Sequence, residues 1–124
     1  MIDSAGTSKW HVGSPPDARS SATAARLGYH LSGRSRQFTA SDLDRFDYVI
    51  AMDSENLRDL RRLCRNDRDL ARLSLLRDHD GGDGDLDVPD PFYGGDHGFD
   101  DVFDICERGC RGLLERICRD HAIP

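Results

Sequence analysis

A short segment near residue 90 places a carboxylic acid between two prolines and directly ahead of two aromatic rings. Pro89 and Pro91 flank Asp90, and a proline restricts the residue before it to extended backbone, so the acid is stiffly mounted. Phe92 and Tyr93 follow at once. A stiffly held acid beside an aromatic wall suits the protonation of an aromatic leaving group. An ordinary proline-rich turn would have the same composition, so both interpretations stay open here.

A second segment near the start of the chain offers hydroxyl groups and a single large ring. Ser4 and Thr7 stand three residues apart, and Trp10, the only tryptophan, follows in a stretch rich in polar residues, Gly and Pro. An aromatic ring in a loop either serves binding or closes the edge of a small core. The sequence does not decide between these two uses.

The elements that must position these residues alternate between strand and helix. The run 48–52 is apolar and rich in β-branched residues, which is typical of a strand buried on both faces. The first expected element is a helix over 18–27, capped by Asp17 and ended by Gly28. A short helix or turn over 41–46, the strand 48–52 and a helix capped by Asp53 or Ser54 follow. The remaining elements are a strand over 73–76, a loop over 78–90 and a helix over 99–117. This order indicates a single α/β domain over 1–124 with a parallel sheet.

Two strands are few for a parallel sheet. Residues 2–4 are the remaining candidate for a third strand, so the chain looks as if it begins in the middle of a fold. Arginines recur between 58 and 72 among acidic residues, and this pattern predicts one solvated helix face rather than a nucleic-acid patch.

At these segments the sequence resembles the low-molecular-weight protein-tyrosine phosphatases. The matching pieces fall in family order over essentially the whole chain, at 3–7, 10–17, 35–37, 46–48, 51–53, 56–57, 90–95 and 98–99. The Gly33-Arg34 pair ahead of Arg36-Gln37 is similar to that of cyanobacterial members. Many other members have a histidine at the place of Gly33, where it braces the active-site loop. The resemblance implies a three-layer α/β fold, with a small parallel sheet flanked by helices.

The resemblance also implies a reaction that needs no metal or cofactor. A cysteine thiolate attacks the phosphorus of phosphotyrosine in a protein substrate, a phosphocysteine forms, and water then releases inorganic phosphate. The matched site residues are Asp90 as the general acid, Trp10, Phe92 and Tyr93 as rings that flank the substrate, and Ser4 and Asp53 in supporting roles. Tyrosinate is a poor leaving group at neutral pH, because the phenol pKa is near 10, so a proton donor is required.

The family's nucleophile and phosphate-binding arginine lie in a Cys-x5-Arg loop between the first strand and the first helix. That unit precedes the match to 3–7, so we expect the chain to be N-terminally truncated, without that strand and helix, and inactive by itself. Cys110 and Arg116 have the required spacing but fall within the predicted helix 99–117. Amide groups inside a helix are already bonded to carbonyls and cannot hold an oxyanion. We expect Cys110 and Cys106 to pack in the core.

Composition excludes several other classes. A net charge of −6 argues against a nucleic-acid binder, and the lack of a long apolar run argues against a membrane span. Four cysteines without an export signal are typical of free thiols in the cytoplasm. The acidic loop does not have the spacing of an EF-hand, so no calcium site is predicted.

Two alternatives to an active phosphatase remain. One is a non-catalytic module that binds phosphotyrosine through the aromatic wall. The other is an arsenate reductase on the same fold, which would require additional redox cysteines after the middle of the chain. Only Cys64 lies in that region, and the Asp-Pro-aromatic segment favours the phosphatase.

Overall fold

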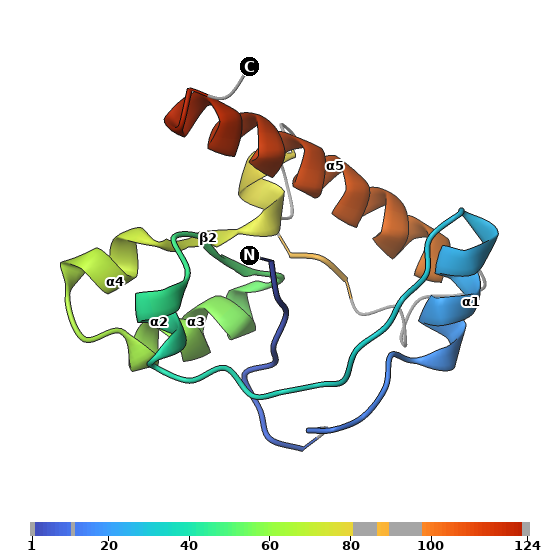
Figure 1. Ribbon diagram of the computed structural model, residues 1–124, viewed down its shortest axis with the longest axis horizontal. Helices are drawn as coiled ribbons and strands as arrows, with labels where there is room; N and C mark the ends of the chain where they lie inside the picture. Colours follow the sequence, from blue (N-terminus) through green and yellow to red (C-terminus); the bar gives the residue numbers. More distant parts are fainter. Residues whose placement is uncertain (1, 11, 81–86, 90–97, 123–124) are drawn as a thin grey trace.

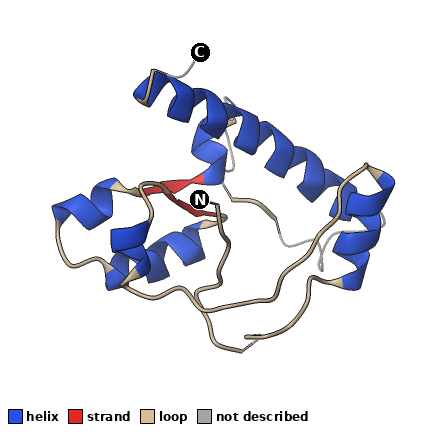
Figure 2. Cartoon of the chain, in the orientation of Figure 1, coloured by secondary structure: helices blue, strands red, loops and turns tan. Residues whose placement is uncertain are grey.

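The computed structural model describes residues 2–10, 12–80, 87–89 and 98–122, and it places two short strands between helices. Figure 1 shows the course of the chain and Figure 2 its helices and strands. The described elements are α1 (Ala18–Arg26), α2 (Asp42–Arg45), β1 (Val49–Ala51), α3 (Ser54–Leu63), α4 (Asp67–Ala71), β2 (Leu73–Leu75), the 3-10 helix η1 (Leu76–His79) and α5 (Gly98–Asp120).

The strands β1 and β2 form a parallel pair. Val49 lies opposite Leu73, and Ala51 lies opposite Leu75. The chain passes from one strand to the other through α3 and α4, because parallel strands need a crossover connection. In Figure 1, α2 and α3 lie below the strands, α4 lies beside the start of β2, and α5 lies above the strands. The expected α/β fold, with a small parallel sheet flanked by helices, is confirmed.

A small core fills the space between the strands and the neighbouring helices. Its buried members are Leu43, Val49, Ala51, Leu60 and Leu75. In β1 the outer two residues are buried, whereas the middle one is half-buried. The strand predicted to be buried on both faces is therefore fully buried on one face only.

The N-terminal segment does not form the expected third strand over 2–4. It makes one parallel bridge, between Gly6 and Gln37. Gly6 donates its N–H to the carbonyl of Arg36 at 2.8 Å, and Phe38 donates to the carbonyl of Gly6 at 2.8 Å. A strand needs a neighbour along several successive residues, and within the described residues only one position of this segment has one.

Helix α1 begins and ends where the sequence predicts. The Asp17 carboxylate accepts hydrogen bonds from the backbone N–H groups of Arg19 and Ser20, which satisfies two donors that the first helical turn leaves open. Gly28 follows the last turn with a φ of +92°, a left-handed conformation that glycine adopts without strain. The predicted cap and stop are both confirmed.

The arginine run over 58–72 is exposed except at Arg72, as predicted, but it spans two helices rather than one helix face. Helix α3 ends at Leu63, and Asn66 caps α4 by accepting from the N–H of Asp69 at 2.9 Å. Arg65, in the connection, donates to Asp44 at 2.6 Å and to Asp69 at 2.9 Å. Arg72 donates to the backbone carbonyls of Leu43 and Phe46. These two arginines connect the crossover to α2, and Arg72 is half-buried whereas Arg65 stays exposed.

Helix α5 approaches η1 most closely at two glycines. A Cβ atom at Gly109 would come within 2.6 Å of Leu76 Cγ, and one at Gly112 within 1.5 Å of the His79 carbonyl oxygen. Cys110 and Leu114 are exposed. The expectation that Cys110 packs in the core is wrong, because the close contact with η1 centres on the two glycines.

Two aspartates are buried in the core, which periodicity did not predict. Arg36 donates to the Asp42 carboxylate at 3.0 Å, and Thr39 donates its backbone N–H to it at 2.9 Å. Burial raises the pKa of Asp42, but the hydrogen bonds from Arg36 and Thr39 outweigh this effect, so the pKa lies below its usual value. Hydrogen bonds from the side chain and backbone of Arg65 likewise lower the pKa of Asp69.

We predict that Gly112→Ala lowers the free energy of unfolding by about 1–3 kcal/mol, the usual cost of overpacking a tight contact. The new Cβ would overlap the His79 carbonyl oxygen. Replacing a glycine by alanine inside a helix otherwise stabilises the protein by roughly 0.5–1 kcal/mol. The sign of the change in unfolding free energy, measured by urea denaturation, therefore tells whether the overlap with His79 exists. The exposed control Cys110→Ala should change stability by less than about 0.5 kcal/mol. A stabilising Gly112→Ala would contradict the close contact.

We predict that the protein loses stability as the pH falls below about 4. Asp42 and Asp69 have lowered pKa values in the folded state, so their contribution is complete above the unfolded-state pKa of about 3.9 and disappears as pH falls through the folded values. Urea denaturation between pH 2.5 and 7 measures this dependence. Asp42→Asn should flatten it, and Asp104→Asn, on the surface of α5, should not. If the free energy of unfolding fell equally steeply with pH in Asp42→Asn and in the parent protein, the prediction would be contradicted.

Candidate functional site

Three segments that are distant in sequence meet at the carboxyl end of β1. They are the loop 4–7, the first turn of α3 after Asp53, and the segment 87–89. Val88 donates its N–H to the carbonyl oxygen of Met52, directly after β1, at 2.8 Å. The carboxyl ends of strands are where α/β proteins gather their ligands, so this edge is the candidate functional site.

Asp53 uses its carboxylate to cap α3. The side chain is half-buried and accepts a hydrogen bond from the N–H of Asn56 at 2.7 Å. Capping leaves this carboxylate bound to backbone. The structure thus places Asp53 where it supports the first turn of α3.

Asp87 attaches the third segment to the same helix end. One of its carboxylate oxygens, Oδ1, accepts from the Ser54 N–H at 2.8 Å and from the Ser54 hydroxyl at 2.7 Å. Arg77 donates through Nη1 to the Asp87 carbonyl at 3.0 Å. Sequence reasoning assigned no role to Asp87, because it concentrated on the acid and the rings that follow. The available signal was a conformationally restricted Val88-Pro89 pair directly after an acid.

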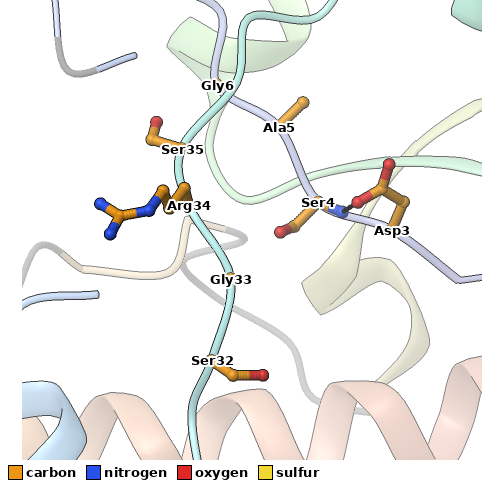
Figure 3. A pocket seen from close by; sticks show the side chains of 8 residues that line it. All are labelled: Asp3, Ser4, Ala5, Gly6, Ser32, Gly33, Arg34 and Ser35. Carbon is orange, nitrogen blue, oxygen red and sulfur yellow. Dashed lines mark hydrogen bonds between the residues drawn. The ribbon is translucent and has the colours of Figure 1, made fainter. Parts of the chain in front are cut away.

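Ser4 lies in a loop that is joined to α3 through Thr7. The Asn56 side-chain amide donates through Nδ2 to the Thr7 hydroxyl at 3.5 Å. Residues 3–6 and 32–35 line an open groove of about 460 Å³ (Figure 3). The Arg34 side chain points away from residues 3–6 in this view and donates to the carbonyl of Gly13 at 3.0 Å.

Trp10 projects from the same N-terminal loop, with 83% of its surface exposed. The loop beyond it is held by backbone hydrogen bonds, from Gly13 to the carbonyl of Ser35 at 2.7 Å and from Ser35 to the carbonyl of Ser14 at 2.8 Å. The alternative that Trp10 closes the edge of the core is therefore wrong, and its ring is available to a ligand. Asp90, Phe92 and Tyr93 lie outside the described residues.

The cysteines of the chain are all free thiols in the structure. Burial raises the pKa of Cys106 and of Cys64, which keeps both protonated at neutral pH. Cys110 lies in the middle of α5, where the amide groups that follow it belong to the helix. None of the described thiols has the surroundings of a phosphate-binding nucleophile.

The described residues contain no group of three or more His, Cys, Asp or Glu side chains arranged to hold a metal ion. Over the same residues, every helix is too short or too polar to cross a membrane.

Comparisons with known proteins agree on one relationship. Residues 1–122 match the family model described as "Low molecular weight phosphotyrosine protein phosphatase". A Streptomyces coelicolor low molecular weight protein-tyrosine-phosphatase is 46% identical over 117 residues, which cover 93% of this chain and 71% of the relative. A Synechocystis protein assigned to the same class is 38% identical over 120 residues, covering 97% and 76%. The expected cyanobacterial relationship is confirmed, although the Streptomyces relative is identical at more positions.

The fold has matching solved structures. A crystal structure of a protein tyrosine phosphatase from Entamoeba histolytica, with Hepes in its active site, superimposes with a TM-score of 0.90 at 33% sequence identity. The superposition covers 98% of this chain and 77% of the Entamoeba chain.

We predict that Asp53→Ala costs about 1 kcal/mol of stability, the usual effect of removing a helix cap. The Asn56 N–H would lose its acceptor at the start of α3. Asp53→Ser, which retains a capping oxygen, should recover most of the loss. Urea denaturation at pH 7 measures both variants. If serine destabilised as much as alanine, the carboxylate would have a role other than capping.

Proposed function

The chain belongs to the low molecular weight phosphotyrosine protein phosphatase family, and from that premise we propose that it provides the acid and substrate-binding parts of a protein-tyrosine phosphatase. Its substrates are phosphotyrosine residues of proteins, and its products are tyrosine and inorganic phosphate. We further propose that residues 1–124 act as one domain, in the cytoplasm and without a metal or cofactor.

The reaction we propose has two steps with opposite proton transfers. A cysteine thiolate attacks phosphorus, an S–P bond forms, and the P–O bond to tyrosine breaks as Asp90 gives its proton to the departing oxygen. Water then attacks the phosphocysteine and gives a proton back to Asp90, while the S–P bond breaks and phosphate leaves. A positioned acid contributes roughly 10²–10⁴-fold to such a step.

The observation that supports this proposal is that the family-matched residues 3–7 and 51–53 meet the segment 87–89, which leads into the matched residues 90–95, at the carboxyl end of β1. The connection from Val88 to Met52 brings the segment that leads into Asp90 to this edge. The exposed Trp10 ring stands in the loop that follows Ser4 and Thr7. We propose that Trp10, Phe92 and Tyr93 flank the phenyl ring of the substrate, and that Ser4 and Asp53 support the loop that holds its phosphate.

We propose that these 124 residues by themselves do not turn over substrate. The only cysteine followed six positions later by arginine is Cys110, with Arg116, and both lie in α5. The nucleophile and the phosphate-binding arginine therefore have to come from outside these residues. Without that loop the remaining groups can protonate and stack but cannot form the S–P bond.

The test compares the 124-residue chain with a fusion that carries the family's Cys-x5-Arg strand, loop and helix ahead of Met1. We predict that the fusion hydrolyses p-nitrophenyl phosphate and a phosphotyrosine peptide, and that the short chain hydrolyses neither. Asp90→Ala in the fusion should lower kcat/KM for the peptide by roughly 10²–10⁴-fold, because tyrosinate then leaves without a proton. Asp104→Asn is the surface control and should leave turnover unchanged.

Two results would contradict the proposal. Turnover by the short chain that disappears in Asp90→Ala would show that the nucleophile lies within the 124 residues. Submillimolar binding of the phosphopeptide to the short chain, together with an inactive fusion, would instead support the non-catalytic binding module.

A further inference from the structure

The segment that leads into Asp90 is fixed by a set of contacts that the reaction proposed above does not use. The Asp87 carboxylate holds the backbone N–H and the hydroxyl of Ser54, and the Val88 N–H holds the carbonyl of Met52. Arg77 holds the Asp87 carbonyl from the other side. We call these four hydrogen bonds the Asp87 clasp.

The chemistry of the clasp explains why an aspartate suits this position. The Ser54 N–H belongs to the first turn of α3, and the open N–H groups and dipole of a helix N-terminus favour a negative charge there. Asp53 accepts from a different N–H group of the same turn, that of Asn56, so the two carboxylates do not compete for one donor. A carboxylate accepts stronger hydrogen bonds than a neutral oxygen does, and the two contacts of Asp87 Oδ1 lie at 2.7 and 2.8 Å.

The other anchor of the clasp is also firmly held. The Arg77 side chain is only 18% exposed, and it pairs at 3.1 Å with the buried carboxylate of Asp80. Arg77 lies in η1, which follows β2 directly. The clasp therefore joins the segment 87–89 to both sides of the βαβ unit, at α3 and at η1.

We propose that Asp87 is a positioning residue for the general acid, an inference that rests on the proposed function of Asp90. Only Val88 and Pro89 stand between the two aspartates, and three Cα-to-Cα steps span about 11 Å at most. Pro89 and Pro91 restrict the residues before them, so a fixed Asp87 limits the directions in which Asp90 can be presented. Asp87 acts on the proton transfer through this geometry and does not itself touch the substrate.

A positioning role can be distinguished from a simple loss of folded protein, because the two would change the turnover of different substrates differently. An acid that is misplaced by 1 Å slows the protonation of the leaving group. Tyrosinate is a strong base and needs that proton, whereas p-nitrophenolate is a much weaker base and leaves more easily without it. A smaller folded fraction would lower turnover of both substrates by the same factor.

The first arm of the test uses the 124-residue chain. We expect Asp87→Ala to speed amide hydrogen exchange at Ser54 and Val88 at least tenfold, with Asp87→Asn in between and Asp104→Asn unchanged. Exchange at Val49, a buried residue of β1 whose N–H bonds to the Arg72 carbonyl at 2.9 Å, monitors global stability and should not change. Unchanged exchange at Ser54 and Val88 in Asp87→Ala would show that the clasp does not form, and would overturn the inference.

The second arm uses the active fusion described under the proposed function. Asp87→Ala should lower kcat/KM at least tenfold for the phosphotyrosine peptide, and by a factor at least three times smaller for p-nitrophenyl phosphate. Asp87→Asn should restore part of the difference, and Asp104→Asn should show none. Equal losses on both substrates would overturn the positioning role. A parent fusion that hydrolyses neither substrate would instead contradict the proposed function, and the exchange arm would still decide whether the clasp exists.

Discussion

The backbone N–H groups at the start of α3 have no partners within the helix, and the site is organised around how the chain supplies them. Asp53, directly before the helix, accepts a hydrogen bond from the N–H of Asn56. Asp87 accepts one from the N–H of Ser54, although it lies more than thirty residues away in the sequence. Because α3 directly follows β1, both carboxylates are brought to the carboxyl end of the strand. The helix end thereby sets where the segment before Asp90 starts.

Burial of charge follows the same logic elsewhere in the molecule. Asp42 and Asp69 are removed from water but each has an arginine and a backbone N–H within hydrogen-bond distance. A buried carboxylate without such partners would be costly. Arg65 binds both Asp69 and Asp44, so it joins the connection between α3 and α4 to α2. The crossover is therefore held by ion pairs as well as by its small apolar core.

The elements that could be predicted from sequence are those decided by neighbouring residues. The Asp17 cap and the stop at Gly28 depend on contacts within four positions, and the run 48–52 identifies β1 by composition alone. Prediction failed where the partner is distant in sequence. Nothing near Gly112 indicates that His79 will approach it, and nothing near Asp87 indicates Ser54.

The same distinction applies to the site residues. The motif match brought Ser4, Trp10 and Asp53 into consideration. Asp53 caps α3 through a contact three positions away, as the sequence predicts, whereas the exposure of Trp10 depends on how separate segments meet. The acid and its following rings, Asp90, Phe92 and Tyr93, lie outside the described residues, so their roles stay predictions.

The glycine contact between α5 and η1 restricts how the helix can turn about its long axis. Gly109 and Gly112 are the positions where α5 comes closest to Leu76 and His79. Any rotation that brought a neighbouring side chain to this contact would drive a Cβ atom into the backbone of η1. The rotation of α5 about its axis is therefore limited by two glycines, which have no side chain. About two turns away along α5, the same orientation places the Phe103 ring against the Tyr29 ring, with centroids 5.2 Å apart.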